Sequence, residues 1–311
     1  MVELSLEQAF MRADFHIERG EVSEARKFYQ AILSAVPNNE RAQQALNALQ
    51  EEELPKKIYS LWFQGVENLP VLIERNFKQW RKLNPEYELI VLDETSCIPY
   101  LKHLQIDYRK ISMQAKSDII RLQILKNKGG IWVDASVFPI KPLEEWIGVA
   151  MQKADFFAFE GNQVSLPISS WFLIAKPNSK ILKFWNELVT AYWSVLRPSF
   201  QGENRDVFHI PKDLMSMLDS FNATEPSPHP YFWVHHLFAI LLQTNPEFRE
   251  EWGNCFKSSS MDVHRYARHF YSMKKNGLKE GPRPIVLIAS DTPMQKLDWR
   301  ENYPANLFKG F

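Results

Sequence analysis

The segment Gly129–Ser136, with the sequence GGIWVDAS, places an acidic residue at the end of a hydrophobic strand. Ile131, Trp132 and Val133 favour a buried strand, whereas aspartate is a poor strand former and is costly to bury without a partner. The two glycines allow the chain to turn sharply into this strand. Asp134 is therefore predicted to lie at a strand's carboxyl end, where acidic side chains bind ligands rather than fill the core.

Strands and helices alternate around this segment. Expected strands cover residues 57–63, 87–92 and 131–133, expected helices cover residues 69–83, 113–128 and 231–243, and a further strand and helix are expected within residues 171–196. This alternation is typical of an α/β sheet. In open α/β sheets ligands bind beyond the carboxyl ends of the strands, which here are marked by Trp62, Asp93 and Asp134.

The first 50 residues have a different pattern, which predicts three helices. Their small, turn, aromatic and helix-breaking positions are similar to those of one tetratricopeptide repeat (TPR), namely Ala13, Gly20, Ala25, Tyr29 and Pro37. One repeat with a capping helix is too short to stand alone, since such arrays need about three. We therefore expect residues 1–52 to form a TPR-like helical unit that packs on residues 53–311 or pairs with a second chain; peptide binding is the less favoured alternative.

The composition limits the classes of function. Lys plus Arg and Asp plus Glu both number 37, so the net charge does not favour binding to nucleic acid or an anionic membrane. Cys97 and Cys255 are too few for a disulfide scaffold and suit a reducing compartment. The chain begins without the pattern of a secretory signal, and no apolar run approaches the length of a membrane span. We therefore expect a cytoplasmic protein without a transmembrane segment.

The helix before the strand carries polar residues beside an apolar stripe. Ser117, Asp118 and Arg121 lie in one stretch, and an i, i+3 acid–base pair of this kind is by itself most often a surface salt bridge. Residues 115–136, AKSDIIRLQILKNKGGIWVDAS, together resemble a block of the DXD glycosyltransferases with a GT-A fold. The resemblance is particularly to capsular polysaccharide synthesis proteins and to related mannosyl- and toxin-type transferases. It extends to residues 54–62 and to the run formed by Trp80, Asn84, Pro85 and Tyr87, with weaker similarity at residues 231–238 and 296–299.

The resemblance implies a GT-A (Rossmann-like) domain over residues 53–311 that uses a nucleotide-sugar donor, favoured as a UDP-sugar. It implies that Trp62 stacks on the base and that Asp118 accepts hydrogen bonds from the ribose. Arg121, with Ser117 beside it, would lie near the ribose, the sugar or the diphosphate. Asp134 would bind Mn²⁺ or Mg²⁺, which would stabilise the diphosphate leaving group.

The chain departs from the family pattern at the second acid of the DXD sequence. Ser136 stands there, so a metal ion would have one carboxylate fewer. We interpret Ser136 as a tolerated variant ligand. Further ligands would come from the C-terminal region, where Asp291, Gln295 and Asp298 are candidates. Lys296 would contact phosphate.

Other polar residues have less specific patterns. His235 and His236 are neighbours on a predicted helix and point in different directions, so one of them would reach the site while the other packs. Glu160, at the end of a predicted strand, and Ser170 are candidates for contacts with donor or acceptor sugars. Residues 262–264, Asp-Val-His, would form a similar loop.

The sequence thus predicts a nucleotide-sugar-dependent glycosyltransferase of bacterial capsular or surface polysaccharide synthesis, metal-assisted and retaining. The catalytic candidates are Asp134, Arg121, His235, His236 and Glu160. Its partners would be the donor, a glycan acceptor, and either a second copy or capsule-assembly proteins bound through the N-terminal helices, at the inner face of the membrane. Two alternatives stay open: transfer of a sugar phosphate, and a non-catalytic TPR adaptor with a degenerate transferase domain.

Overall fold

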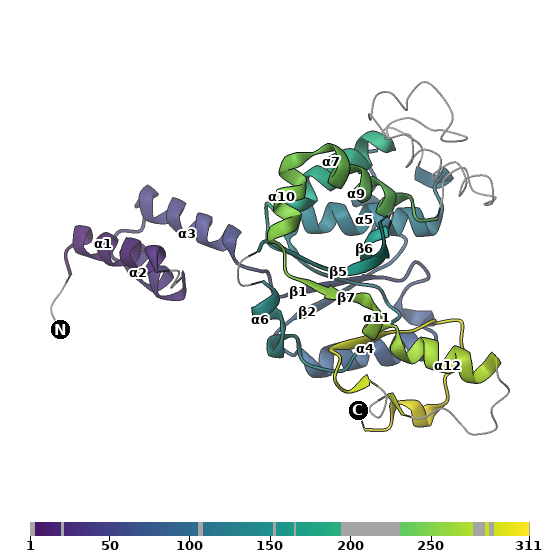
Figure 1. Ribbon diagram of the computed structural model, residues 1–311. Helices are drawn as coiled ribbons and strands as arrows, with labels where there is room; N and C mark the ends of the chain where they lie inside the picture. The colour runs from purple at the N-terminus through teal and green to yellow at the C-terminus, as the bar shows by residue number, and fades with distance from the viewer. Residues whose placement is uncertain are drawn as a thin grey trace. The chain divides into compact units, whose positions relative to one another are not determined.

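The computed structural model describes residues 4–19, 22–104, 108–151, 154–164, 166–193, 231–275, 284–285 and 289–310. Contacts within the chain divide it into two compact units, Met1–Leu54 and Pro55–Phe311 (Figure 1). This division lies close to the boundary predicted between residues 52 and 53. Each unit has its own hydrophobic core.

The N-terminal unit contains the three predicted helices, α1 (Leu6–Glu18), α2 (Val22–Ala35) and α3 (Glu40–Glu52). Ser5 and Asn39 cap α1 and α3 by accepting backbone N–H groups that have no partner within the helix. The buried side chains lie on one stripe of each helix and include Phe10, Ala13, Ala25, Tyr29, Ile32, Ala42 and Leu46. The helices are confirmed, while their assignment to a tetratricopeptide repeat stays a prediction.

The larger unit is built on a mixed six-stranded sheet in the order β2-β1-β3-β6-β5-β7. Its strands are β1 (Lys57–Leu61), β2 (Glu88–Leu92), β3 (Gly130–Val133), β5 (Phe156–Gln163), β6 (Leu166–Ala175) and β7 (Lys257–Ser259). Strands β2, β1 and β3 run parallel, whereas β6 is antiparallel to both β3 and β5. The predicted α/β class is confirmed, and the carboxyl ends of the three parallel strands share one edge.

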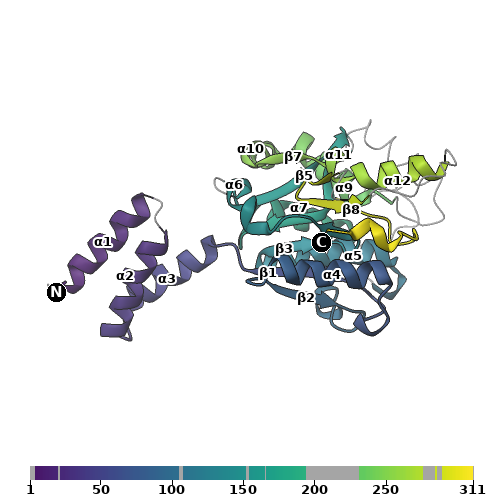
Figure 2. The same ribbon diagram turned by 90° about the horizontal axis from the view of Figure 1, so that it is seen from below.

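Helices cover both faces of the sheet (Figure 1). On one face lie α5 (Met113–Lys128), α7 (Lys180–Tyr192), α9 (Trp233–Thr244) and α10 (Pro246–Asn254). On the other lie α4 (Val71–Leu83), α11 (Ser260–Val263) and α12 (Arg265–Lys275), and Figure 2 views the molecule from this side. The short α6 (Ile147–Ala150) and 3-10 turns at Val66–Asn68, Ile98–Tyr100, Tyr108–Lys110, Leu143–Glu145 and Ala305–Phe308 complete the described helices. No described helix is long and apolar enough to cross a bilayer.

The glycine pair before β3 is required by backbone geometry. Gly129 and Gly130 have φ angles of 61° and 106°. A Cβ atom on Gly129 would lie 2.8 Å from Cδ of Pro177, and one on Gly130 would lie 2.9 Å from the carbonyl oxygen of Lys57. Any side chain at either position would therefore strain the backbone and clash, which explains the sharp turn predicted from the sequence.

Helix α4 fixes the chain that follows β3. The side-chain amide of Asn76 donates to the carbonyl of Ala135 at 2.8 Å, and the indole of Trp80 donates to the carbonyl of Val137 at 3.0 Å. Asn84, at the C-terminus of α4, accepts the N–H of Leu143 at 2.7 Å. Trp80 and Asn84, which carry part of the family resemblance, are thus supports that hold the Asp134 segment in place.

A second, two-stranded sheet brings the C-terminus of the chain to this region. It consists of β4 (Val137–Pro139) and β8 (Met294–Lys296), which pair antiparallel with Val137 opposite Lys296. The N–H of Leu297 donates to the carbonyl of Ser136 at 3.0 Å. The segment that follows β3 is therefore joined to the end of β8 by backbone hydrogen bonds.

Candidate active site at the carboxyl edge of the sheet

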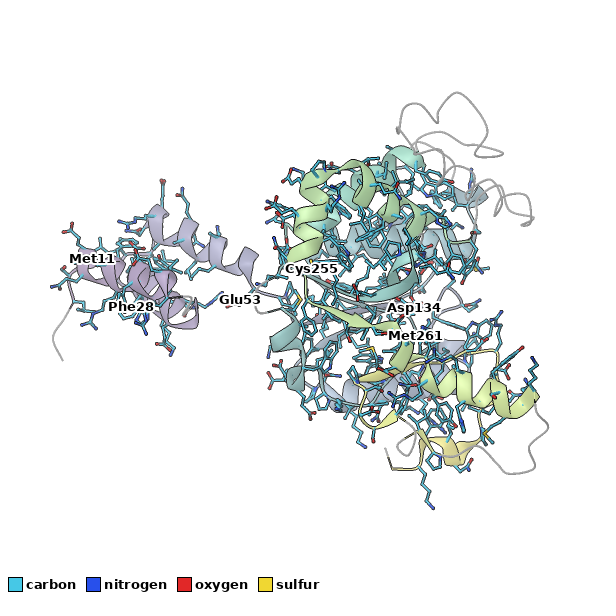
Figure 3. The ribbon with its side chains drawn as sticks, viewed as in Figure 1. Met11, Phe28, Glu53, Asp134, Cys255 and Met261 are labelled. Carbon is cyan, nitrogen blue, oxygen red and sulfur yellow. The ribbon has the colours of Figure 1, made fainter. Side chains whose placement is uncertain are left out.

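A cleft of about 650 Å³ opens beyond the carboxyl ends of β1 and β3. Segments far apart in the sequence line it: residues 61–64 after β1, one face of α5, residues 134–136 after β3, the start of α9, and residues 296–300 after β8. Figure 3 shows Asp134 at the edge of the sheet, between the two helical layers. The cleft thus lies where ligands bind in open α/β sheets.

Arg121 contacts side chains of Ser117, Asp118, Asp134 and Ser170 within this cleft. It is 5% exposed, and its guanidinium donates to the carbonyl and hydroxyl oxygens of Ser170 at 2.8 and 2.6 Å and to the hydroxyl of Ser117 at 3.2 Å. It also forms ion pairs with Asp118 at 3.1 Å and with Asp134 at 3.3 Å. Arg121 therefore links α5, β6 and the end of β3, and it fixes two carboxylates relative to each other.

Asp134 is held through both carboxylate oxygens. Oδ1 accepts a hydrogen bond from the indole N–H of Trp132 at 3.0 Å and faces Arg121. Oδ2 accepts a hydrogen bond from Nζ of Lys296 at 2.8 Å. Burial raises the pKa of Asp134, but Lys296 and then Arg121 outweigh burial, so the net effect is a pKa below the usual range. Asp134 is consequently ionised at neutral pH.

Asp118 lies on the other side of the same arginine and has a different charge state. Burial raises the pKa of this carboxyl to about 7, with Arg121 opposing the shift and Asp134 adding to it. Asp118 has one cationic partner where Asp134 has two. At neutral pH Asp118 is thus close to its titration midpoint, and a polar ligand that donates hydrogen bonds would favour its ionised form.

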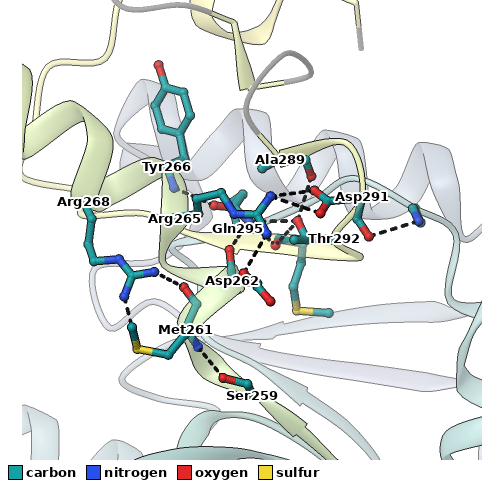
Figure 4. Close-up of polar contacts among 12 residues, drawn as sticks. Ser259, Met261, Asp262, Arg265, Tyr266, Arg268, Ala289, Asp291, Thr292 and Gln295 are labelled. Atoms are coloured by element: carbon teal, nitrogen blue, oxygen red, sulfur yellow. Dashed lines mark hydrogen bonds and ion pairs between the residues drawn. The ribbon is translucent and has the colours of Figure 1, made fainter.

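Lys296 is positioned by the residue before it. The buried side chain of Gln295 accepts the N–H of Tyr266 at 2.8 Å and donates to the carbonyl of Asp262 and the hydroxyl of Thr292 (Figure 4). These bonds tie β8 to α11 and α12. Because successive side chains of a strand point to opposite faces, Gln295 points into this network while Lys296 points to the cleft.

Two tryptophans form an aromatic wall of the cleft. Trp62, directly after β1, packs edge-on against Trp299, with ring centroids 5.4 Å apart and planes at 86°. Trp62 is half-buried, and both rings line the cleft. An aromatic face at this place can stack on a planar ring of a ligand.

The histidine pair of α9 divides as the sequence predicts. His235 lines the cleft, whereas His236 is fully buried on the helix face that packs into the core. Burial, together with the nearby Arg121 and His236, lowers the pKa of His235 to about 3. His235 is therefore a neutral imidazole at physiological pH. His264 also lines the cleft, and burial lowers its pKa to about 4.

Several predicted site residues do not line the cleft. Glu160 is exposed on β5, near β7. Asp291 forms an ion pair with Arg265 at 2.8 Å, and the amide of Gln295 is used within the network of Figure 4. Asp93 accepts hydrogen bonds from the backbone of its own turn. The structure brings together Trp62, Ser117, Asp118, Arg121, Asp134, Ser136, Ser170, His235, Lys296 and Asp298.

The residues around Asp134 do not fit a divalent cation. Nζ of Lys296 lies 2.8 Å from Oδ2 of Asp134 and 2.7 Å from the hydroxyl of Ser136, so the oxygens expected to hold a metal already contact a cation. Mg²⁺ and Mn²⁺ prefer several oxygen ligands. Within the described part of the chain, no three or more His, Cys, Asp or Glu side chains come together in a way that could hold a metal ion. The expected Mn²⁺ or Mg²⁺ site is therefore not supported by the donor set.

Some cleft residues were not predicted from the sequence. Trp132 reads as a core residue of a strand, yet its indole N–H reaches Asp134, two positions later on the same strand face. The two-residue spacing between Trp132 and Asp134 is the only feature of the sequence that could have indicated this contact. Tyr231, Phe232 and Arg300 also line the cleft, and Arg300 has no local pattern that distinguishes it from other basic residues.

Comparison with known proteins identifies the family. The sequence profile described as "Capsular polysaccharide synthesis protein" matches residues 12–201, more than half of the chain. The chain belongs to this family. The match begins within α1, so it includes most of the N-terminal helical unit.

The curated relatives have names of one enzyme class. The chain is 24% identical over 159 residues to the "Glycosyltransferase afumC" of Aspergillus fumigatus, a match that covers 44% of this chain and 40% of the relative. It is 26% identical over 159 residues to the "O-glycosyltransferase PaGT" of Phomopsis amygdali, covering 44% and 39%. It is 24% identical over 108 residues to the "Initiation-specific alpha-1,6-mannosyltransferase" of Candida albicans, covering 32% and 28%. The chain thus spans at most about two fifths of the length of these curated relatives.

Among solved structures, the "PaToxG Glycosyltransferase" aligns with 75% of this chain and 84% of its own, at 16% identity and a TM-score of 0.36. The UDP-bound glycosyltransferase domain from the YGT toxin aligns with 66% and 80%, at 9% identity and a TM-score of 0.39. These scores are too low to establish a shared fold.

Proposed function

We propose that this chain is a nucleotide-sugar-dependent glycosyltransferase of GT-A architecture that acts in the synthesis of a bacterial capsular or surface polysaccharide. The observation that carries the proposal is the convergence of an aromatic wall, a buried carboxyl and fixed cations in one cleft at the carboxyl edge of the sheet. Membership of the capsular polysaccharide synthesis family and the glycosyltransferase names of the curated relatives support it.

The cleft offers a complementary group for each part of a nucleotide sugar. The face of Trp62 would stack on the base, and the carboxylate of Asp118 would accept hydrogen bonds from the ribose hydroxyls. The diphosphate would then lie towards Lys296, with Arg121 holding the two carboxylates behind it. The neutral His235, which lines the cleft, would bind a sugar hydroxyl.

The protein would act mainly by alignment and electrostatics. It would hold the anomeric carbon next to an acceptor hydroxyl and stabilise the negative charge that develops on the departing diphosphate. Asp134 would serve this arrangement by orienting Lys296 and Arg121, since both of its oxygens are engaged. Retention of anomeric configuration is the outcome favoured by the family resemblance, and product NMR would test it.

A donor screen tests the proposed function. The full chain is incubated with a panel of UDP- and GDP-sugars and glycan acceptors, and the nucleotide released is identified. Release of a nucleoside diphosphate that depends on the acceptor is expected. Release of a nucleoside monophosphate would instead indicate sugar-phosphate transfer, and release of neither would favour the non-catalytic adaptor. Glu160→Gln, an exposed change outside the cleft, is the matched control and should behave as the unaltered chain.

A further inference from the structure

We propose that Lys296 takes the place of a divalent cation in this cleft, so that the chain binds and activates its donor without metal. This inference rests on the proposed function and names how the same site neutralises the diphosphate. It starts from the position of the Lys296 ammonium, which bridges Asp134 and Ser136 at 2.8 and 2.7 Å.

The charges around Asp134 support the replacement of a metal ion by Lys296. Two carboxylates with one divalent cation sum to zero, and so do the carboxylates of Asp134 and ionised Asp118 with the cations of Lys296 and Arg121. The hydroxyl of Ser136 removes one negative charge from the DXD pattern, and Lys296 supplies one positive charge where a metal would supply two. A divalent ion added beside Lys296 would leave this centre with an uncompensated double positive charge. Relative to a metal-binding DXD site, Ser136 thus removes negative charge and Lys296 supplies less positive charge, so the two differences offset each other.

The fold itself also positions the ammonium. Lys296 is opposite Val137 in the β4–β8 pair, the next residue donates its N–H to Ser136, and Gln295 anchors the strand from its other face. Its side chain is 19% exposed, unlike a solvated surface lysine. A cation fixed in this way stabilises developing negative charge without the cost of reorganising at the moment of reaction.

In the transfer step, the bond between the anomeric carbon and the β-phosphate oxygen breaks, and its electron pair stays on that oxygen. The acceptor hydroxyl oxygen bonds to the anomeric carbon, and its proton is released to solvent. The nucleoside diphosphate product has one more negative charge than the donor had on that oxygen. Lys296 lies at the cleft surface where it can pair with this charge.

Binding of UDP and GDP to the full chain tests the inference by isothermal titration calorimetry, in EDTA and in excess Mn²⁺. We expect the affinity in EDTA to be within about twofold of that in Mn²⁺, and electron paramagnetic resonance to show no protein-bound Mn²⁺ without nucleotide. Lys296→Met keeps the length of the side chain and removes its charge, and it should weaken nucleotide binding in EDTA at least tenfold. Lys78→Met, an exposed lysine of α4 paired with Glu74, is the control and should have no effect.

A double variant provides the converse test. Ser136→Asp combined with Lys296→Met restores two carboxylates and removes the ammonium. It should gain Mn²⁺ binding and recover nucleotide affinity only when Mn²⁺ is present. Circular dichroism and the melting temperature establish that each variant is folded.

Three results would overturn the inference. If EDTA abolishes nucleotide binding to the unaltered chain and Mn²⁺ restores it, a metal is required, and the proposed function still stands. If folded Lys296→Met binds nucleotide as tightly as the unaltered chain in EDTA, Lys296 is not the cation that meets the diphosphate. If the unaltered chain binds neither UDP nor GDP in either condition, the proposed function fails and the inference fails with it.

Discussion

The two walls of the cleft are encoded in different ways. One wall comes from residues 117–136, a continuous block in which Asp118, Arg121 and Asp134 follow one another through α5 and β3. The other comes from residues 296–300 at the end of the chain, which reach the cleft through the pairing of β8 with β4. The first wall supplies carboxylates, and the second supplies the cation that balances one of them.

This difference explains the contrast between the two buried carboxyls. Arg121 contacts both Asp118 and Asp134, but Lys296 reaches only Asp134. Burial consequently dominates at Asp118 and raises its pKa to about 7, whereas the two cations dominate at Asp134 and lower its pKa. The local block places the acids, and the remote segment decides which of them stays ionised.

Removing the carboxylate shared by the two walls should have the largest effect. Asp134→Asn leaves Lys296 and Arg121 without the negative charge that orients them. We expect the rate of nucleoside diphosphate release to fall by roughly 10²–10³-fold, as for the loss of one preorganised electrostatic contact. Asp93→Asn is the matched control, because Asp93 also follows a parallel strand but lies outside the cleft. Turnover of Asp134→Asn near that of the control would refute the central role of Asp134.

The aromatic wall joins the same two regions through Trp62 and Trp299. Trp62→Ala should weaken UDP or GDP binding by about 1–3 kcal/mol if the ring stacks on the base. Trp62→Phe keeps an aromatic face and should lose less. Calorimetry and the melting temperature are measured together. A loss of roughly 3–5 kcal/mol in stability with unchanged affinity would show that Trp62 is only a core residue.

The pH dependence of binding tests the carboxyl that lacks a second cation. Asp118 must ionise to accept hydrogen bonds from two ribose hydroxyls, so nucleotide affinity should rise as pH increases through about 7. Asp118→Asn should remove this part of the pH dependence, while titration of the nucleotide's own phosphate remains in both proteins. An identical pH profile for the two proteins would contradict the assignment.

The raised pKa of Asp118 also makes the free energy of unfolding depend on pH. The pKa of Asp118 is raised in the folded state from 3.8 to about 7, so between these pH values the folded chain binds more protons at this site than the unfolded chain. Its contribution to the free energy of unfolding therefore decreases as pH rises from about 4 to 7. Asp118→Asn should lose that decrease, which urea titrations at several pH values would measure.

Deleting residues 1–52 should have the smallest effect on the cleft. All cleft residues lie beyond Pro55, and the N-terminal helices have a separate core. Nucleotide affinity should change by less than about twofold. Light scattering would show whether the deletion lowers the oligomeric state, and long and short acceptors would show whether the helices contribute to polymer binding. A collapse of nucleotide binding would place these helices within the catalytic unit.

The sequence alone determined the local elements and the residues they carry. Periodicity predicted α2 and α5 with the bounds that the structure has, and the glycine pair predicted the turn that positive φ angles require. Asp118, Arg121 and Asp134 could be predicted as one site because a helix, a tight turn and a strand fix their relative positions over a short stretch of chain. Neighbouring side chains on a helix diverge, which is why one histidine of the pair at 235 and 236 faces the cleft and the other packs.

Only the tertiary structure decided how the end of the chain contributes. Gln295 and Asp291 have the chemistry of metal ligands, yet their polar atoms are used in the network around Arg265 and Tyr266. Lys296 has the pattern of an ordinary solvated lysine, yet the β4–β8 pairing places its ammonium between Asp134 and Ser136. Local sequence sets the direction of a side chain within its own strand or helix. A contact between residues 160 positions apart, such as Lys296 and Ser136, depends on which strands pair and which helices cover them. Long-range hydrogen bonds and core packing fix the positions of those strands and helices.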